Sequence, residues 1–394
     1  MRLAHFVQTG RMAGGLERYL ATLFRSGSPD LSHAVVTHAA EPCDFCGEWP
    51  AVAWPWLAGA RRAGGAAAGI SLPAGIAVFH GPPSRAALDR VLTGGRPAAA
   101  FVHDHAWWCP SGARYHSSTG TICSIRAGTL PCAVRYHALR CGSVRPRAAL
   151  EGFRRARAGR EALLRMRAVL VASRFMRDEA VRHGVPSELV HVVPLPPTVS
   201  AAGAPSPASG AGPTVLCVSR LTPLKGIEQL LAAFGAMRVE AQLVLTGTGN
   251  AAARLRHMAA AHPACDRILF AGQLDDTALR AAYSRAAVVA VPSLWPEPFG
   301  LVGIEALAAG RPVVASGTGG MEDWARKDLG VLVAPADRPV AFAAALDRAL
   351  SEPVWRERAA LAGTAWVAAR HGSDAHLRAL VEALGPLAAE GGAA

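Results

Sequence analysis

The sequence contains no apolar run long enough to cross a membrane. No stretch of about 18 residues is free of charged side chains and of proline and glycine clusters. The opening segment, MRLAHFVQTG, lacks the apolar centre of a secretion signal. Long acidic and low-complexity tails are also absent, and 51% of the residues are hydrophobic, as in a globular protein with packed cores. We therefore expect a cytoplasmic protein.

Lysine is almost absent. Of the 41 basic residues only Lys225 and Lys327 are lysines, and the formal net charge is +12. Such a charge suits nucleic acid, an anionic membrane surface or phosphate-bearing small molecules. The arginines are scattered and are not interleaved with aromatic residues, so we expect no specific nucleic-acid binding. Their densest run, residues 153–167, fits a solvated helix face and leaves peripheral contact with an anionic membrane open.

The eight cysteines form no strong metal-binding motif. A reducing compartment disfavours structural disulfides, and a single C-x-x-C is a weak signal because structural zinc usually takes two such pairs. The pair is Cys43 and Cys46; four widely spaced cysteines follow at Cys109, Cys123, Cys132 and Cys141, and Cys217 and Cys265 stand alone. We expect buried or incidental thiols, with a zinc site in the loop of four cysteines as the alternative.

Strand-like segments alternate with alanine-rich helical patterns, which indicates βαβ units and parallel sheets. A chain of 394 residues suits two domains. The first set of strands is RLAHFVQ, HAVVTHA, GIAVFH, AAAFVH, AVLVAS and LVHVVP; the second is TVLCVS, AQLVLTG, RILFAG, VVAVPS, RPVVAS and GVLVAP. Residues 201–214 between them contain little that can pack and form a linker. We predict an α/β protein of two Rossmann-like domains whose parallel sheets face a central cleft, where ligands bind.

A candidate phosphate site follows the first strand of the second set. Arg220 lies at the strand end, Lys225 precedes the next helix, and Gly226 allows close backbone approach. Two cations and a helix N-terminus together suit a diphosphate. Surface cations are the plainer interpretation, but a lysine is unexpected in a chain that uses arginine almost everywhere.

A second glycine turn follows the first strand of the chain. It places Gly15 at a helix start, without the G-x-G-x-x-G pattern and the later acidic residue of a dehydrogenase. We expect a tight turn whose backbone touches phosphate or acceptor.

Two carboxylates surround a helix start in the segment PEPFGLVGIE. Glu297 precedes Pro298, which suits a first helical turn, and Glu305 lies about two turns further on. Carboxylates this far apart suit hydroxyls at different places on an extended ligand, and not the opposed pair of a glycosidase. A helix-terminus contact for Glu297 and a surface ion pair for Glu305 are the structural alternatives.

The segments RLTPLKG, EPFGLVGIE and SGTGGMED, after an N-terminal GGLERY, resemble the GT4 family of retaining glycosyltransferases with the GT-B fold. The resemblance covers nearly the whole chain, and its most specific part is the E-x7-E element. It implies that Glu297 contacts the donor sugar, as a catalytic residue, and Glu305 the ribose. The other donor residues it implies are Arg220, Lys225, Gly15 and Leu301 for the diphosphate, and Phe299 and Gly300 for the sugar.

The segment FVHDHAWWCP is similar to the family's strand-end histidine. The resemblance places His103 beside the sugar, on the opposite domain, as a second catalytic residue; a core histidine is the alternative. The acceptor side would be lined by Asp104, Trp107, Trp108 and Ser173.

The resemblance implies three regions: residues 1–200 for the acceptor, residues 201–370 for the donor, and a helix in 371–394 that crosses back to the first domain. It implies transfer from a nucleoside-diphosphate sugar, UDP- or GDP-linked, to an acceptor hydroxyl of a glycan, a lipid-linked or a small molecule. No metal or other cofactor is expected, and no D-x-D metal motif is found. Two alternatives stay open, a sugar-nucleotide epimerase and a non-catalytic protein of the same fold that binds sugar nucleotides or glycans.

Overall fold

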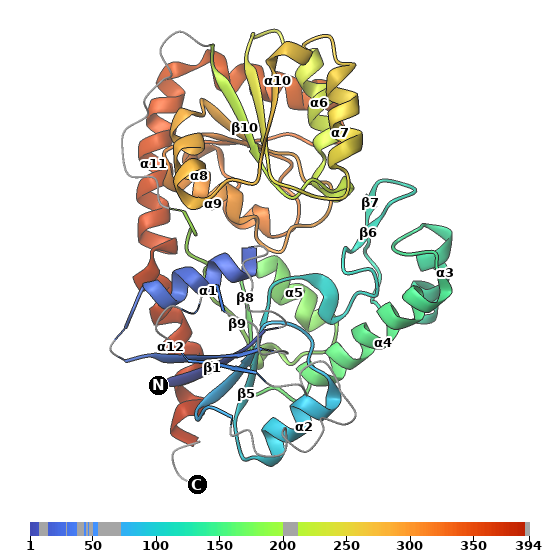
Figure 1. Cartoon of the computed structure of the whole chain (residues 1–394), viewed down its shortest axis with the longest axis vertical. Helices are drawn as coiled ribbons and strands as arrows, with labels where there is room; N and C mark the ends of the chain where they lie inside the picture. The colour runs from blue at the N-terminus through green and yellow to red at the C-terminus, as the bar shows by residue number, and fades with distance from the viewer. Residues whose placement is uncertain are drawn as a thin grey trace. The chain divides into compact units, whose positions relative to one another are not determined.

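The computed structural model describes residues 1–7, 15–28, 30–37, 43–44, 46, 50–53, 72–199 and 212–390. The chain divides into two compact units (Figure 1). The first comprises Met1–Pro196 and Ser373–Ala394, and the second comprises Pro197–Gly372. Most of the expected linker at 201–214 and the expected glycine turn before Gly15 lie outside the described residues.

The first unit is built on a seven-stranded sheet with the order β3-β2-β1-β4-β5-β8-β9. All of its strand pairs are parallel. The strands are β1 (Arg2–Phe6), β2 (Ser32–Thr37), β3 (Ala51–Ala53), β4 (Ile76–Phe79), β5 (Ala98–Val102), β8 (Ala168–Val171) and β9 (Val190–Val192). Sequences such as AAAFV and AVLV are apolar throughout because helices cover both faces of a parallel sheet. The helices are α1 (Gly15–Arg25), α2 (Arg85–Thr93), α4 (Pro146–Leu163), α5 (Arg174–Arg182) and α12 (Ser373–Glu390).

An insertion leaves the first sheet between β5 and α4. It holds the 3-10 turn η3 (His105–Trp107), the short hairpin β6 (Tyr115–His116) and β7 (Thr121–Ile122), and helix α3 (Leu130–Ala138). Figure 1 shows this teal segment beside α4. Strands β3, β6 and β7 were not predicted; β6 and β7 have two residues each, too few to carry a periodic pattern.

The second unit is built on a six-stranded parallel sheet with the order β12-β11-β10-β13-β14-β15. The strands are β10 (Thr214–Val218), β11 (Gln242–Thr246), β12 (Ile268–Gly272), β13 (Val288–Val291), β14 (Val313–Ala315) and β15 (Val331–Val333). The helices are α6 (Ile227–Ala236), α7 (Ala252–Ala260), α8 (Asp276–Arg285), α9 (Leu301–Ala308), α10 (Pro339–Ser351) and α11 (Pro353–His371). The prediction of two Rossmann-like domains with parallel sheets is confirmed.

In each sheet the strand order reverses once, between β1 and β4 and between β10 and β13. Ligands of open α/β sheets bind beyond the carboxyl ends of the strands at such a reversal. The loops that follow β10 and β13 are the two that carry Arg220, Lys225 and Glu297. The topology therefore brings together two motifs that stand about 70 residues apart in the chain.

Candidate functional site

The loop after β10 is held against the loop after β13 by backbone contacts. Gly226 adopts the left-handed conformation, with φ +67°, and a Cβ atom there would lie 1.9 Å from the carbonyl oxygen of Pro292. The amide of Leu294 donates to the carbonyl of Leu224 at 2.9 Å. Only glycine fits at position 226, so the 3-10 turn η5 (Pro223–Lys225) ends with Lys225 held beside the second loop.

Lys225 and Glu297 form an ion pair at this junction. The Lys225 Nζ atom lies 2.5 Å from Oε1 of Glu297, which is 5% exposed, and Ser293 donates to the same oxygen. The ammonium also lies 5.3 Å from the centre of the Trp295 ring. Burial raises the pKa of Glu297, but the charge and hydrogen bond of Lys225 and the bond from Ser293 outweigh it and hold the pKa below its ordinary value. Glu297 is therefore an anion at neutral pH.

Arg220 is exposed two residues beyond the end of β10, in the same loop as Lys225. Helix α6 begins immediately after this loop, so its N-terminal amide groups point toward the same side as the two cations. A guanidinium binds a phosphate through two parallel hydrogen bonds, and an ammonium binds it as a point charge. The loop thus has the chemistry of an anion site.

The backbone of the segment from Glu297 to Phe299 is held in place by hydrogen bonds to its carbonyl groups. Gly320 donates to the carbonyl of Glu297 at 2.6 Å, and Trp324 Nε1 donates to the carbonyl of Phe299 at 2.7 Å. The Phe299 ring is buried against His371, 5.4 Å between ring centres.

Helix α9 begins at Leu301, and so the expectation that Pro298 lies in its first turn is wrong. Gly300 has φ +80°, which a helix does not allow, and Glu297 forms a bridge with Gly319. The amide of Gly303 donates to the carbonyl of Gly300 at 2.9 Å, whereas the first amides of the helix, those of Leu301 and Val302, have no partner within it.

Glu305 is buried in α9 and is not part of a surface ion pair. Tyr283 donates to its Oε2 at 2.8 Å, and Thr198 donates to Oε1. A ribose could therefore contact Glu305 only if one of its hydroxyls replaced the Thr198 hydroxyl as the donor to Oε1. Glu305 and Glu297 lie in separate hydrogen-bond networks, as their spacing indicated.

In the first unit four histidines form a continuous chain. Contacts of 3.0, 2.9 and 2.9 Å join Nδ1 of His33 to Nε2 of His5, Nδ1 of His5 to Nε2 of His80, and Nδ1 of His80 to Nε2 of His103. Each contact needs one donor and one acceptor, so neutral rings joined in this order all carry the same tautomer. The tautomer of His103, at the end of β5, is therefore coupled to a ring on β2.

The histidine chain is neutral. Burial, followed by the charge of His376, lowers the pKa of His103 to about 3, and burial lowers the pKa of His33 to about 4. The pKa values of His5 and His80 are also well below the ordinary value, first through burial and then through their histidine neighbours.

The chain ends beside α1 and α12. The Tyr19 hydroxyl lies 3.1 Å from Nε2 of His376, whose Nδ1 lies 2.8 Å from the carbonyl of Pro194. Because a carbonyl can only accept, Nδ1 of His376 carries the proton and Nε2 accepts from the tyrosine. The rings of Tyr19 and His103 lie 5.5 Å apart.

Three residues expected on the acceptor side are buried. Trp107 and Trp108 are both 0% exposed and belong to the core of the first unit, where Trp108 stacks on His183 at 5.2 Å. Ser173 is also 0% exposed, and its hydroxyl caps α5 by accepting from the amide of Met176. These expectations are wrong because large indoles fill the space between the sheet and α4, and the serine serves a helix terminus.

Asp104 and Gly15 are exposed. The Asp104 carboxylate caps η3 by accepting from Ala106 at 2.8 Å, and Gly15 is the first residue of α1.

Two cysteines depart from the expectation of unpaired thiols. Cys43 and Cys46 form a disulfide, with 5.5 Å between their Cα atoms. The remaining six are free: Cys109, Cys123, Cys132, Cys141, Cys217 and Cys265. Within the described ranges, no three side chains of His, Cys, Asp or Glu are already arranged around a common point as metal ligands.

Sequence reasoning missed the partners of the expected residues. Ser293 follows β13 four positions before Glu297, while Thr198 and Tyr283 reach Glu305 from distant segments. His5 and His80 had a detectable signal, because His5 stands between the apolar residues Ala4 and Phe6 of β1, and His80 follows β4, whose four residues are all apolar.

Residues 204–366 match the family model described as glycosyl transferases group 1. The chain is 35% identical over 192 residues to D-inositol 3-phosphate glycosyltransferase of Salinispora tropica, covering 45% of this chain and 39% of that protein. It is 40% identical over 157 residues to phosphatidyl-myo-inositol mannosyltransferase of Mycobacterium leprae, covering 39% and 41%. The chain thus spans about two fifths of the length of these relatives.

Solved structures match over 98% of the chain. The Anabaena protein HepE, in complex with UDP, has a TM-score of 0.73 at 18% identity over 100% of its own chain. Sucrose-phosphate synthase of Thermosynechococcus elongatus has a TM-score of 0.71 at 21% identity over 99% of its chain. These likenesses show that the chain has the predicted GT-B fold. Of the helices described here, none has both the length and the apolar character needed to span a membrane.

Removing one partner of the buried ion pair tests its role in stability. We expect Lys225→Ala to lower the free energy of unfolding by about 2–3 kcal/mol, because Glu297 is left as an unpaired buried charge. The pKa of that carboxyl then rises above its unfolded value, so the loss is larger at pH 8 than at pH 5. The free energies of unfolding of Lys225→Ala and of the double variant Lys225→Ala, Glu297→Gln are measured with urea at pH 5 and pH 8. Equal stability of the two variants at pH 8 would contradict the pairing.

The neutral histidine chain predicts a loss of stability in acid. The pKa values of these histidines are lower in the folded than in the unfolded chain. The free energy of unfolding is therefore largest above about pH 6.5. It falls as the pH is lowered, because the unfolded chain then binds protons that the folded chain does not. We expect about 1–2 kcal/mol per buried histidine between pH 7 and pH 5. Urea unfolding at the two pH values should show a smaller drop for His5→Gln than for the parent. The exposed His137→Gln serves as the control; an equal drop in all three proteins would contradict the assignment.

Proposed function

We propose that this protein, whose residues 204–366 match the family model described as glycosyl transferases group 1, is a retaining glycosyltransferase. It moves a sugar from a nucleoside-diphosphate sugar, UDP- or GDP-linked, to an acceptor hydroxyl. In this proposal residues 201–370 bind the donor, and residues 1–200 with 371–394 bind the acceptor. The acceptor is a hydroxyl-bearing glycan, lipid-linked or small molecule.

The observation that carries the proposal is the Lys225–Glu297 pair at the reversal point of the second sheet. A transferred sugar and its departing diphosphate lie next to each other, and so the site needs an acceptor of sugar hydroxyls beside a cation for phosphate. Glu297 is an anion that can accept from hydroxyls, and Lys225 can bind a phosphate oxygen. Because they are already in contact, one ligand can engage both.

The remaining donor contacts follow from the same loops. Arg220, Lys225 and the N-terminus of α6 meet the charge that develops on the departing diphosphate, without a role for a metal ion in the transfer. Amides at the start of α9, from Gly300 and Leu301, bind sugar and phosphate oxygens.

Glu305 would accept from the ribose, with the ribose hydroxyl replacing that of Thr198. His103 would contact the sugar as a neutral ring, which can donate or accept a hydrogen bond but carries no charge. Gly15 begins a helix and offers a backbone amide to phosphate or acceptor.

The structural neighbours support a nucleotide-sugar donor, since HepE has been solved with UDP and with UDP-glucose. Each of those structures shares only the fold with this chain, at 18% identity. The choice between a UDP- and a GDP-sugar is therefore a matter for binding experiments.

Ligand-induced stabilisation tests the donor site. We expect UDP or GDP to raise the melting temperature, equally with and without a chelator, because the ligand binds only the folded state. Arg220→Ala should weaken binding about 10- to 100-fold, since a hydrogen bond to a charged group contributes about 1.5–3 kcal/mol. Arg285→Ala removes an exposed arginine of α8 in the same unit and should leave binding unchanged. Absence of stabilisation by every nucleoside diphosphate would refute the proposal.

The products formed from the bound donor distinguish a transferase from an epimerase and from a non-catalytic binding protein. Incubation with the stabilising nucleotide's sugar conjugate, followed by NMR of the sugar, should show free nucleoside diphosphate and sugar released or transferred with the same anomeric configuration. Interconversion of the sugar while it stays attached to the nucleotide would indicate an epimerase. A donor that binds and stays intact, with every class of acceptor offered, would indicate a binding protein.

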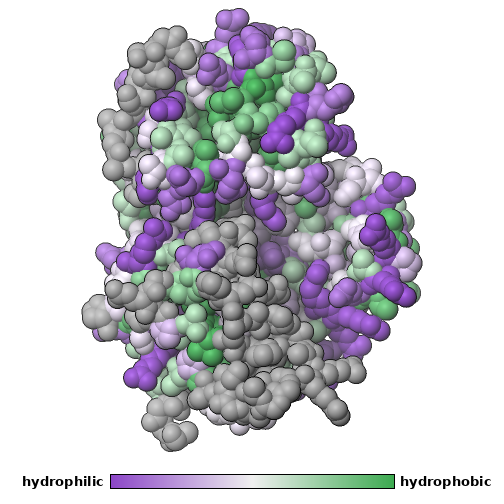
Figure 2. Space-filling view, viewed as in Figure 1, coloured by the Kyte–Doolittle hydropathy of each residue, from purple (hydrophilic) through white to green (hydrophobic). Residues whose placement is uncertain are grey.

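We also propose peripheral contact with an anionic membrane through α3 and the start of α4. Leu130, Val134 and Val144 are 79%, 62% and 66% exposed, and exposed arginines lie among them. Figure 2 shows apolar and hydrophilic side chains interspersed at this place. Sedimentation should show binding to vesicles with anionic lipid, weakened by salt, and none to neutral vesicles. A Leu130→Asp, Val134→Asp variant that sediments like the parent would refute this surface.

A further inference from the structure

Four free cysteines of the insertion lie around one small cavity. Cys109 follows η3, Cys123 follows β7, Cys132 lies in α3 and Cys141 follows α3. All four line a cavity of about 20 Å³, which is room for about one water-sized particle. The sequence analysis left this convergence open as the alternative to incidental thiols, and in the structure the β6–β7 hairpin and α3 bring the cysteines together from four positions along the insertion.

The cavity also has a buried nitrogen without a partner. His116 is 5% exposed and lines the same cavity; its Nδ1 lies 3.3 Å from the Thr121 hydroxyl, while its Nε2 has no hydrogen-bond partner. Buried polar atoms are paired in the great majority of cases. This nitrogen lines the same cavity as the four cysteines and is free to form a hydrogen bond with a ligand, or with a ligated thiolate, in the cavity.

The thiols are close enough to influence one another. Burial, followed by the neighbouring Cys123, Cys109 and Cys132, raises the pKa of Cys141 to about 11. The pKa of Cys132 is raised by burial as well, with additional contributions from Cys109 and Cys123.

Arginines surround the thiols. Arg114 Nη1 donates to the Cys123 sulfur at 3.8 Å, Arg135 lines the cavity, and the charge of Arg160 lowers the pKa of Cys132. Four thiolates around a divalent cation carry a net charge of −2, which these guanidinium groups offset. Hydrogen bonds from such neighbours orient metal ligands and stabilise their charge.

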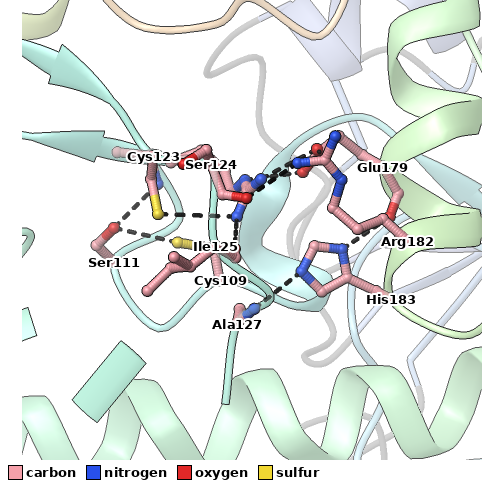
Figure 3. A network of polar contacts seen from close by, with 11 residues as sticks. Cys109, Ser111, Cys123, Ser124, Ile125, Ala127, Glu179, Arg182 and His183 are labelled. Carbon is pink, nitrogen blue, oxygen red and sulfur yellow. Dashed lines mark hydrogen bonds and ion pairs between the residues drawn. The ribbon is translucent and has the colours of Figure 1, made fainter. Parts of the chain in front are cut away.

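The insertion has little core of its own. Its hairpin has two residues in each strand, and residues 117–122 are exposed. Arg114 pairs with Glu179 of α5 at 2.7 Å, which ties the base of the segment to this helix. Figure 3 shows Ala127 beside His183, the residue after α5, to whose Nε2 it donates at 3.2 Å. In the same view the sulfur atoms of Cys109 and Cys123 point to one region beside Ser111. A segment with so small a core usually needs a disulfide or a metal ion to hold its shape.

We propose that Cys109, Cys123, Cys132 and Cys141 bind one Zn²⁺ as a structural site of four thiolates. Four sulfur ligands complete the tetrahedral shell of zinc, so the ion has no open position for substrate. Each thiol loses its proton to solvent on binding, and no electron is transferred. His116 Nε2 then donates to a thiolate from outside the shell.

Binding requires the sulfurs to turn inward by side-chain rotation. The bonds that they make now are weak and replaceable: Cys109 Sγ lies 3.3 Å from Ser111 Oγ, and Cys141 Sγ donates to the carbonyl of Arg135 at 3.6 Å. A cavity for one small particle suits a single ion and not a larger iron–sulfur cluster. The proposed zinc site is structural, so the proposed sugar transfer remains independent of metal. It differs from the expectation that the protein binds no metal.

Cobalt substitution and metal analysis test the site. The full-length protein, reduced and freed of metal, is titrated with Co²⁺ and then with Zn²⁺. We expect one equivalent of Co²⁺ to produce the intense visible bands and the sulfur-to-metal charge-transfer band of a tetrahedral thiolate site, and Zn²⁺ to abolish them. Thiol titration of the native fold should show four fewer reactive cysteines with Zn²⁺ than without. This second measurement needs no variant and so does not depend on the folding of one.

Variants assign the ligands. Cys123→Ser and Cys141→Ser should each lower Zn²⁺ affinity by at least 100-fold, whereas Cys265→Ser, which removes an exposed thiol of the second unit, and His116→Ala should retain one equivalent. Zinc should also slow proteolysis within residues 109–141 of the parent. Failure to bind Co²⁺ or Zn²⁺, retention of tight binding by both ligand variants, loss of binding in His116→Ala, or disulfides among the four cysteines in freshly purified protein would overturn the proposal.

Discussion

The buried ion pair between Lys225 and Glu297 constrains the rest of the second unit. A carboxylate that is 5% exposed needs a cation and hydrogen bonds to stay ionised, and Lys225 and Ser293 supply them. The lysine can reach the carboxylate only because the loops after β10 and β13 pack backbone against backbone at Gly226. Parallel strand order places those two loops side by side at the reversal of the sheet. The pair thus connects topology, loop geometry and charge at one point.

The first unit handles its polar groups differently. The rings from His33 to His103 contact one another, and burial keeps them neutral, so this chain is joined by hydrogen bonds and not by charge. A neutral, coupled chain gives His103 a defined tautomer without giving it a proton to donate as an acid at neutral pH. In the proposed transferase, charge stabilisation therefore comes from the donor loops, while the first unit offers oriented dipoles. The cavity lined by the four cysteines lies in the same unit, and the proposed zinc ion in it would stabilise the insertion.

Much of the fold could be predicted from sequence, because apolar strands such as VVAV and AVLV alternate with amphipathic helices over the whole chain. The two-residue strands β6 and β7 carry no period and were missed. For the candidate site, Arg220, Lys225 and Glu297 could be proposed from sequence because they follow strands, and Lys225 also because lysine is rare in this chain. Trp107, Trp108 and Ser173 also follow strands, but they are buried, since sequence position cannot distinguish a side chain that turns into the core from one that faces a ligand. The partners Thr198 and Tyr283 of Glu305 are distant in sequence and had no signal.

The most direct test of the central claim is a crystal structure of the protein with the nucleoside diphosphate that it binds most tightly. The account predicts diphosphate oxygens within about 2.7–3.2 Å of Lys225 Nζ and of the Arg220 guanidinium, with Glu297 still beside the lysine. The contrary result is a nucleotide bound elsewhere, or one bound beyond β10 with Lys225 paired only to Glu297 and without contact to phosphate. In either case the ion pair is a structural feature of the loop and does not bind the diphosphate.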